Sequence, residues 1–263
     1  MRVGVVGYGY VGKALTTFFR RAHLVVTYDK NLDGHCSSRN KEDIAACDVV
    51  FVAVPTPPIA NDGRCDTSAV EEVAGWVEAP LCIKSTVIPG TVDRLAAVNR
   101  REIVFSPEYI GESPGHPWSE PDSCGFVIVG GPGETATLVT NAYRSCAPQL
   151  TFHYTDARTA ELCKYMENCF LATKVCFVNQ FYEIAQVFGV SFEELRGLWL
   201  LDKRVGESHT RVIDGRGFGG RCLPKDMTAI VASLADHGGA PLLEAVLRYN
   251  SRVRSNRVTA GVC

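Results

Sequence analysis

Short apolar runs rich in valine alternate with amphipathic stretches over the first half of the chain. The amphipathic stretches include residues 11–22 and 66–79, where apolar side chains recur at helical spacing. The apolar runs are RVGVVG (2–7), LVVTYD (24–29), DVVFVAVP (48–55), LCIKSTVI (81–88), EIVFSP (102–107) and GFVIVGG (125–131). This repeated order of strand, helix and strand predicts an α/β fold of the Rossmann type, a doubly wound parallel sheet with helices on both faces.

The pattern changes near residue 150, where helical spacing continues without a break. From about Asp156 to Gly189 the chain predicts one long helix, which Thr155 or Asp156 caps and Gly189 ends. A helix of about 30 residues is about 45 Å long. Such a helix needs packing partners along its length, so we expect it to form a homodimer interface over residues 156–189.

Shorter helices follow the long one. SFEELRGLWLLD (191–202) predicts a helix capped by Ser191, with Glu194 three residues on. A glycine-rich loop, a helix from about Leu223 and a final helix over 242–256 complete the chain. The expected domains are an N-terminal Rossmann-type domain over 1–152 and a smaller all-helical domain over 153–263.

Composition narrows the class of protein. The 263 residues are 46% hydrophobic and 21% charged, and the formal net charge is −2. This balance does not favour nucleic acid or an anionic membrane as a partner. No apolar run approaches the roughly 20 residues that cross a membrane, and no signal peptide is evident, so we expect a cytoplasmic protein.

Eleven cysteines are spread through the chain. They form no CxxC pair and show no metal-ligand spacing, so we expect no metal site. Most sit among apolar residues and are expected to be small buried side chains in a reducing compartment.

A glycine motif, GYGYVG (7–12), follows the first predicted strand and opens a helix. Gly7 permits a tight turn, Gly9 lets the backbone approach a pyrophosphate, and Gly12 allows close packing of helix on strand. Asp29 ends the second strand, where a carboxylate holds ribose hydroxyls and repels a 2′-phosphate. The pattern therefore predicts NAD rather than NADP, a preference that Lys30 tempers slightly.

A second glycine-rich segment, GFGGRCLPKD (217–226), surrounds Cys222. Pro224 suits the first turn of a helix, which places Cys222 near a helix N-terminus beside a lysine and an arginine. That setting favours a reactive thiolate. Asp226 lies one helical turn further on. Taken alone, the segment leaves a nucleophile and a buried structural cysteine equally open.

Other polar residues favour chemistry at Cys222. Lys164 and Asn168 stand four residues apart on the long helix, and together they suit a developing oxyanion. Glu108 and Glu112 follow the fifth strand and Thr86 ends the fourth, at the sheet edge where such folds bind ligands. A solvated polar stripe on the helix, and ordinary surface carboxylates, are the plain alternatives.

Taken together, these segments resemble the UDP-glucose/GDP-mannose dehydrogenase family. The resemblance runs in order over nearly the whole chain. It rests on GYGYVG, VPTP (54–57), KSTVIPGT (84–91), SPEYIGE (106–112), ELCKYMENCFLATKVCFVNQ (161–180) and GFGGRCLPKD. The resemblance implies oxidation of a primary alcohol of a nucleotide sugar to a carboxylate with two NAD⁺, and UDP-glucose is the expected substrate.

The resemblance also implies a role for each matching residue. Cys222 attacks the aldehyde and carries the thioester, and Lys164 with Asn168 stabilises the oxyanions. Asp226, with Thr86, positions a water, Glu108 acts in thioester hydrolysis, and Glu112 orients the sugar or relays a proton. The implied cofactor-binding residues are Gly7, Gly9, Tyr10, Val11, Gly12, Asp29, Lys30, Pro55, Thr56, Thr86 and Glu112. The implied substrate-binding residues are Glu108, Tyr109, Ile110, Glu112, Lys164, Asn168, Gly219 and Cys222.

The resemblance leaves out one part of the family's architecture. Members ordinarily carry a third, nucleotide-binding domain, which this sequence does not match, so a short form is expected. Two alternatives stay open. One is a catalytically silent NAD-binding dimer that needs a partner chain, and the other is a two-electron dehydrogenase of the β-hydroxyacid type, which needs no cysteine.

Overall fold

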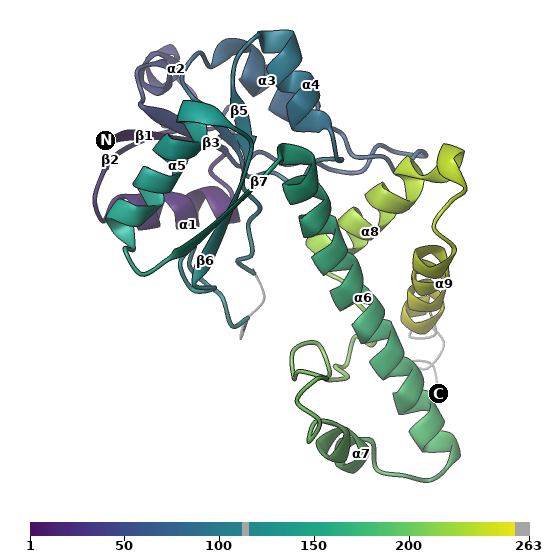
Figure 1. Ribbon diagram of the computed structural model, residues 1–263. Coiled ribbons are helices and arrows are strands. Elements are labelled where there is room, and N and C mark those ends of the chain that lie inside the picture. Colours follow the sequence, from purple (N-terminus) through teal and green to yellow (C-terminus); the bar gives the residue numbers. More distant parts are fainter. Residues whose placement is uncertain (112–115, 256–263) are drawn as a thin grey trace. The chain divides into compact units, whose positions relative to one another are not determined.

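A computed structural model describes residues 1–111 and 116–255 of the chain. Over these residues seven strands form one sheet in the order β2-β1-β3-β4-β5-β6-β7 (Figure 1). They are β1 (Arg2–Val6), β2 (Leu24–Tyr28), β3 (Val49–Val52), β4 (Leu81–Ile83), β5 (Ile103–Phe105), β6 (Phe126–Gly130) and β7 (Thr151–Thr155). Strands β1 to β5 are mutually parallel, as the sequence predicts.

The last two strands differ from the expectation. β6 pairs antiparallel with β5, and β7, which the sequence did not predict, pairs parallel with β6. β7 has the sequence TFHYT with mostly exposed side chains at the sheet edge, so it lacks the apolar run that marks the inner strands.

Five helices connect the strands of this sheet, and three of them were not predicted. They are α1 (Tyr10–Phe19), α2 (Ser38–Ala45), α3 (Ser68–Trp76), α4 (Thr91–Asn99) and α5 (Gly133–Cys146). α2, α4 and α5 have weaker apolar patterns, because much of each helix is polar and only one side meets the sheet.

Alternate residues of the inner strands pack against different helices. On one face of β3, Val50 and Val52 join a core with α3 and α4. On the other face, Val49 and Phe51 join a core with α1 and α5 (Figure 1). Both faces of the sheet are therefore covered, which explains why these strands are continuously apolar in the sequence.

Four α-helices and one 3-10 turn follow β7 in the described chain. They are α6 (Ala157–Val187), α7 (Phe192–Trp199), α8 (Cys222–Ser233), a 3-10 turn (Ala235–His237) and α9 (Pro241–Ser255). Asp156 accepts a hydrogen bond from the Thr159 N–H at the start of α6, and Gly189 follows its end with φ 66°. The Ser191 side chain accepts from the Glu194 N–H at the start of α7. The sequence predicted all four helices and these caps.

The chain divides into two compact units. The first comprises Met1–Pro57 and Cys65–Lys164, and the second comprises Pro58–Arg64 and Tyr165–Cys263. The expected boundary at residues 152/153 falls inside β7, and the first unit continues into the first turns of α6. Residues 58–64 belong to the second unit, and a side chain at Gly63 would lie 2.9 Å from a methyl carbon of Thr228 on α8.

The described residues contain no helix that is long and apolar enough to cross a membrane. They also contain no group of three or more His, Cys, Asp or Glu side chains arranged to hold a metal ion. Every cysteine within residues 1–111 and 116–255 carries a free thiol.

Candidate active site

The first glycine motif forms the turn between β1 and α1. Gly7 has φ 91°, and its N–H donates to the Tyr28 carbonyl at 2.8 Å. A Cβ at Gly12 would come within 1.8 Å of the Gly7 carbonyl oxygen, whereas one at Gly9 would meet nothing within 4 Å. α1 starts after Gly9 without a side-chain cap, so its first N–H groups remain available to an anion. This cradle fits the pyrophosphate of a dinucleotide.

Asp29 follows β2 beside that turn. Its two carboxylate oxygens accept from the backbone N–H groups of Tyr8 at 2.8 Å and Asn31 at 2.9 Å. Each oxygen retains a lone pair for a ribose hydroxyl, so the position suits the adenosine half of NAD. Lys30 makes an ion pair with Glu72 at 2.7 Å.

Two hydrogen bonds connect the remaining predicted cofactor-binding segments. The Thr56 hydroxyl donates to the Thr86 carbonyl at 2.7 Å, which joins the segments after β3 and β4. The Tyr10 hydroxyl donates to the Gly111 carbonyl at 2.6 Å. Pro55 is exposed and Val11 is half-buried. Glu112, predicted for both cofactor and substrate, lies outside the described residues.

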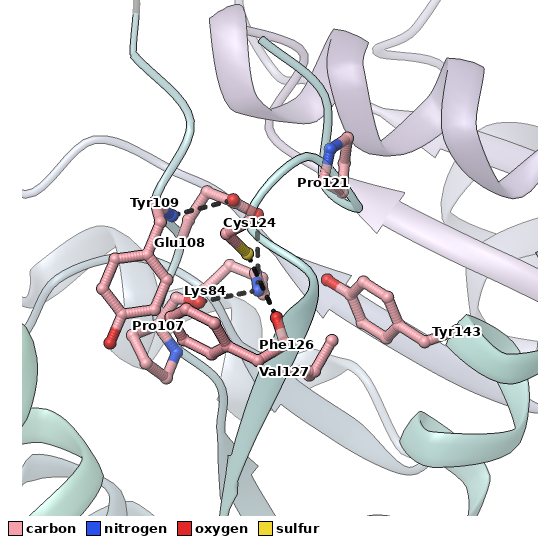
Figure 2. A pocket seen from close by; sticks show the side chains of 9 residues that line it. All are labelled: Lys84, Pro107, Glu108, Tyr109, Pro121, Cys124, Phe126, Val127 and Tyr143. Carbon is pink, nitrogen blue, oxygen red and sulfur yellow. Dashed lines mark hydrogen bonds and ion pairs between the residues drawn. The ribbon is translucent and has the colours of Figure 1, made fainter. Parts of the chain in front are cut away.

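Glu108 follows β5 in the segment SPEYI and is nearly buried. Its Oε1 accepts from the N–H groups of Tyr109 at 2.8 Å and Ile110 at 3.2 Å. Its Oε2 lies 3.4 Å from the ammonium of Lys84, which comes from the end of β4 (Figure 2). Lys84 was not predicted as a site residue, although a lysine inside the apolar run LCIKSTVI is a visible signal.

The amino-terminal turns of α6 carry Lys164. Its Nζ lies over the ring of Tyr109, 4.6 Å from the centroid. The Tyr109 hydroxyl lies 3.9 Å from the Sγ of Cys163. The first unit thus holds Thr86, Glu108, Tyr109, Ile110 and Lys164 of the predicted site.

In the second unit, α6 and α8 bring a buried polar pair together. Asn168 Nδ2 donates to Asp226 Oδ2 at 2.5 Å, and the side chains are 5% and 1% exposed respectively. Lys225 forms an ion pair with the other carboxylate oxygen of Asp226. A buried carboxylate with both oxygens bonded has a fixed orientation, which proton transfer requires.

Cys222 is the first residue of α8, and its side chain is exposed. The helix start was predicted from Pro224, and it places the thiol at the positive end of the helix dipole. Exposure removes the plain alternative of a buried structural cysteine. In contrast, burial raises the pKa of the thiols of Cys169 and Cys176 to about 12.

The glycine loop before Cys222 is fixed by α6 and α9. Asn250 Oδ1 accepts from the Phe218 N–H at 2.7 Å, and its Nδ2 donates to the Phe218 carbonyl at 3.1 Å. Asn179 on α6 accepts from the Gly217 N–H at 3.0 Å. A Cβ at Gly219 would come within 2.7 Å of the Arg254 guanidinium. The loop is therefore held by buried amides on both sides.

The fold and these two glycine segments define a class: a protein with a Rossmann-type dinucleotide domain and a helical domain that presents an exposed cysteine at a helix start. Comparison with known families agrees. Residues 27–145 match the NAD binding domain of the UDP-glucose/GDP-mannose dehydrogenase family, and residues 158–252 match its central domain. The chain belongs to the UDP-glucose/GDP-mannose dehydrogenase family, and the cofactor of its first domain is NAD.

Individual relatives are similar over most of the chain. A UDP-glucose 6-dehydrogenase of Rhizobium meliloti (strain 1021) is 31% identical over 90% of this chain and 64% of its own length. The structure of a UDP-glucose dehydrogenase from Pyrobaculum islandicum has a TM-score of 0.82 at 28% identity, covering 95% of this chain and 68% of the other.

Another solved structure, of which this chain covers a larger share, is similar to it in fold alone. A 3-hydroxyisobutyrate dehydrogenase from Mycobacterium tuberculosis has a TM-score of 0.64 at 15% identity, covering 95% of this chain and 92% of the other. The chain spans about half to two thirds of the length of the curated relatives it matches.

Proposed function

We propose that this chain performs the oxidation of a nucleotide sugar at C6, from primary alcohol to carboxylate, through a covalent bond to Cys222. The single observation that carries the proposal is the exposed Cys222 at the start of α8, one helical turn from the buried pair of Asp226 and Asn168. A dehydrogenase that released an aldehyde or ketone would need no such cysteine.

The first glycine motif and Asp29 would hold NAD⁺, which would supply the hydride acceptor for both oxidations. The chain's own residues do the rest. After the alcohol becomes an aldehyde, the Cys222 thiolate adds to its carbonyl carbon and forms a thiohemiacetal. Loss of a second hydride gives a thioester, and water then displaces the thiolate to leave the carboxylate.

Polar residues stabilise and deprotonate the intermediates of this route. The Lys164 ammonium and the Asn168 amide are the donors for the oxyanion that forms at each addition. Asp226, whose carboxylate Lys225 and Asn168 hold in place, takes part in proton transfer to and from a water positioned with Thr86. Glu108 accepts a proton from the water that hydrolyses the thioester.

The substrate we propose is UDP-glucose, giving UDP-glucuronate. The similarity to the UDP-glucose dehydrogenases of Rhizobium meliloti and Pyrobaculum islandicum supports this choice. The test is NADH formation from UDP-glucose by the parent chain and by Cys222→Ser. We expect turnover by the parent and a loss of at least about 100-fold in the variant. Absence of NADH with every nucleotide sugar in a panel would refute the proposal for this chain.

A second candidate is a two-electron dehydrogenase, favoured by the fold match over 92% of the shorter 3-hydroxyisobutyrate dehydrogenase. Cys222→Ala separates the two, because full activity in that variant supports the two-electron reaction. A silent NAD-binding module is the third reading. Calorimetry that shows NAD binding without turnover of any sugar would favour it.

We further propose that the chain is a cytoplasmic homodimer built on α6. Large apolar side chains along this helix and just after it are exposed, as an unpartnered interface requires. They are Leu162, Met166, Phe170, Phe177, Phe181, Val187 and Phe188. The free thiols of the described cysteines fit a reducing compartment.

A further inference from the structure

The first unit contains a buried cluster behind Glu108. Its pocket is lined by side chains from the segments after β4 and β5, from the loop before β6, from β6 and from α5 (Figure 2). The lining residues with titratable side chains are Lys84, Glu108, Tyr109, Cys124 and Tyr143. None of the roles assigned above uses Lys84 or Tyr143, although burying a charged amine is costly unless it is paired.

Lys84 contacts three consecutive residues. Its Nζ lies 3.3 Å from the Ser106 hydroxyl, 3.1 Å from the Pro107 carbonyl and 3.4 Å from Glu108 Oε2. The lysine side chain is 2% exposed. The ammonium therefore makes two hydrogen bonds and one ion pair, all with the SPE segment. Since Ile83 pairs with Phe105 in the sheet, Lys84 reaches this segment from the adjacent strand end.

The other titratable groups that face Glu108 are uncharged at neutral pH. Burial raises the pKa of the Cys82 thiol to about 12, and it raises the pKa of the Cys124 thiol as well. Burial also raises the pKa of the Tyr143 phenol above its ordinary value. Burial acts to lower the pKa of Lys84, but Glu108, Tyr143 and Cys82 together outweigh that effect, and the pKa is raised. Lys84 is thus the one cation facing Glu108 among these groups.

Two buried oxygens in this cluster have Lys84 as a charged neighbour but make no hydrogen bond of normal geometry with any described residue. They are Glu108 Oε2 and the Tyr143 hydroxyl. Figure 2 shows the Tyr143 hydroxyl directed toward the pocket that Glu108 and Lys84 line. A buried polar group left unpaired costs about 1–3 kcal/mol, so a water molecule shared by such groups is favoured.

We propose that Lys84 is the positioning residue for Glu108: it keeps this carboxylate ionised and fixes the SPE backbone, while Tyr143 completes a water site at Glu108 Oε2. The proposal rests on the function proposed above, in which Glu108 accepts a proton from the hydrolytic water. Glu108 is then already a carboxylate, and therefore a base, before the substrate binds. The proton passes from the attacking water to Glu108 as the water oxygen bonds to the thioester carbon, and the carbon–sulfur bond then breaks to release the Cys222 thiolate.

The first test is a pH profile of kcat for the parent, Lys84→Met and Lys84→Arg. We expect Lys84→Met to lower kcat about 10- to 100-fold at pH 7, with KM for NAD⁺ within about twofold of the parent. In Lys84→Met we expect the acid limb of the kcat profile to shift to higher pH by about one unit or more. In Lys84→Arg we expect most of the lost kcat and most of the parent's pH profile to be restored. Lys41→Met, which removes a lysine packed on Trp76, is the matched control.

A double variant separates positioning from a general loss of structure. In the Glu108→Gln background, we expect Lys84→Met to change kcat less than about threefold, because the group that Lys84 serves is already neutral. If the two losses multiply, or if Lys84→Met keeps the parent profile, the proposal is wrong.

The last test needs no turnover. Infrared difference spectra with ¹³C-labelled glutamate, assigned with Glu108→Gln, report the charge of Glu108 directly at pH 6–7. We expect a carboxylate band in the parent and in Lys84→Arg, and a carboxylic acid band in Lys84→Met. A carboxylate band in all three overturns the proposal even if the chain oxidises no sugar.

If Lys84→Met does not fold, Tyr143→Phe is used, for which we expect the carboxylate to persist and kcat to fall about 3- to 10-fold. An unchanged kcat in Tyr143→Phe would contradict the water site.

Discussion

At the scale of single residues, glycines were predictable and buried partners were not. The GYGYVG spacing identified each glycine, because only glycine tolerates φ 91° at Gly7 and the approach of Gly12 to the Gly7 carbonyl. Lys84 was missed, since its meaning depends on Ser106, Pro107 and Glu108 on the adjacent strand end. Sequence spacing does not show which distant residue a side chain meets.

Gly12 and Gly9 are expected to respond differently to substitution by alanine. Gly12→Ala places a Cβ against the Gly7 carbonyl, so we expect the free energy of unfolding to fall by about 2 kcal/mol or more. Gly9→Ala puts its Cβ in open space, so we expect normal stability with NAD⁺ affinity reduced at least about 10-fold. Urea denaturation and calorimetry measure the two effects. Equal stabilities of the two variants would contradict this account of the turn.

Cys222 carries the reactivity prediction at this scale. An exposed thiol at a helix N-terminus is expected to react with iodoacetamide faster than Cys36, another exposed cysteine. Mass spectrometry of peptides after brief labelling at pH 7 measures both rates. Preferential labelling of Cys36 would remove the basis for a nucleophilic Cys222.

At the scale of elements, long periodic helices were predicted well and short surface elements poorly. α6, α8 and α9 appear within one or two residues of the predicted positions, and α7 starts one residue after its predicted start and ends three residues before its predicted end. α2 and β7 were missed, because their few buried residues do not produce a periodic signal. α4 was also missed, and its start is held by a residue from another helix: Glu161 on α6 accepts from the N–H groups of Gly90 at 2.6 Å and Val92 at 2.9 Å.

This cap predicts a pH dependence of stability. Burial raises the pKa of Glu161 to about 7 from an ordinary value of 4.5, although the two N–H groups act to lower it. The native state therefore holds a proton between about pH 4.5 and 7 that the unfolded chain does not. The contribution of Glu161 to the free energy of unfolding is therefore fully present below about pH 4.5. It is lost as the pH rises from there through 7.

The test compares the free energy of unfolding of the parent with that of Glu161→Gln at each pH. From pH 5 to pH 8 we expect the value for the parent to fall by about 2 kcal/mol relative to the variant. Arg158 and Asp93, which pair with each other at 2.8 Å, are the charged neighbours that modulate the shift. Glu134→Gln, at an exposed first turn of α5, is the control and should show no such trend. A pH-independent difference for Glu161→Gln would contradict the prediction.

The apolar stripe of α6 predicts an interface. Phe170 and Phe177 are 62% and 48% exposed, and replacing both with Glu is expected to convert a dimer into a monomer. Light scattering after size-exclusion chromatography measures the mass. Val98→Glu, at an apolar residue of α4 that is 72% exposed, should leave the mass unchanged. A monomeric parent would refute the dimer.

At the scale of the whole molecule, the order of segments predicted the family better than any one segment did. The NAD binding and central domains both match, at 27–145 and 158–252, as the ordered motifs imply. The division into units was harder to predict, because residues 58–64 leave the first unit and α6 continues across the boundary. Contacts between distant segments, rather than local pattern, decide such boundaries.

The measurement that tests the central claim most directly is the number of NADH formed per nucleotide sugar consumed. With UDP-glucose limiting and NAD⁺ in excess, the covalent route through Cys222 predicts two NADH and one UDP-glucuronate per UDP-glucose. One NADH per sugar with release of an aldehyde, or two NADH in a Cys222→Ala variant at the parent's rate, would contradict it.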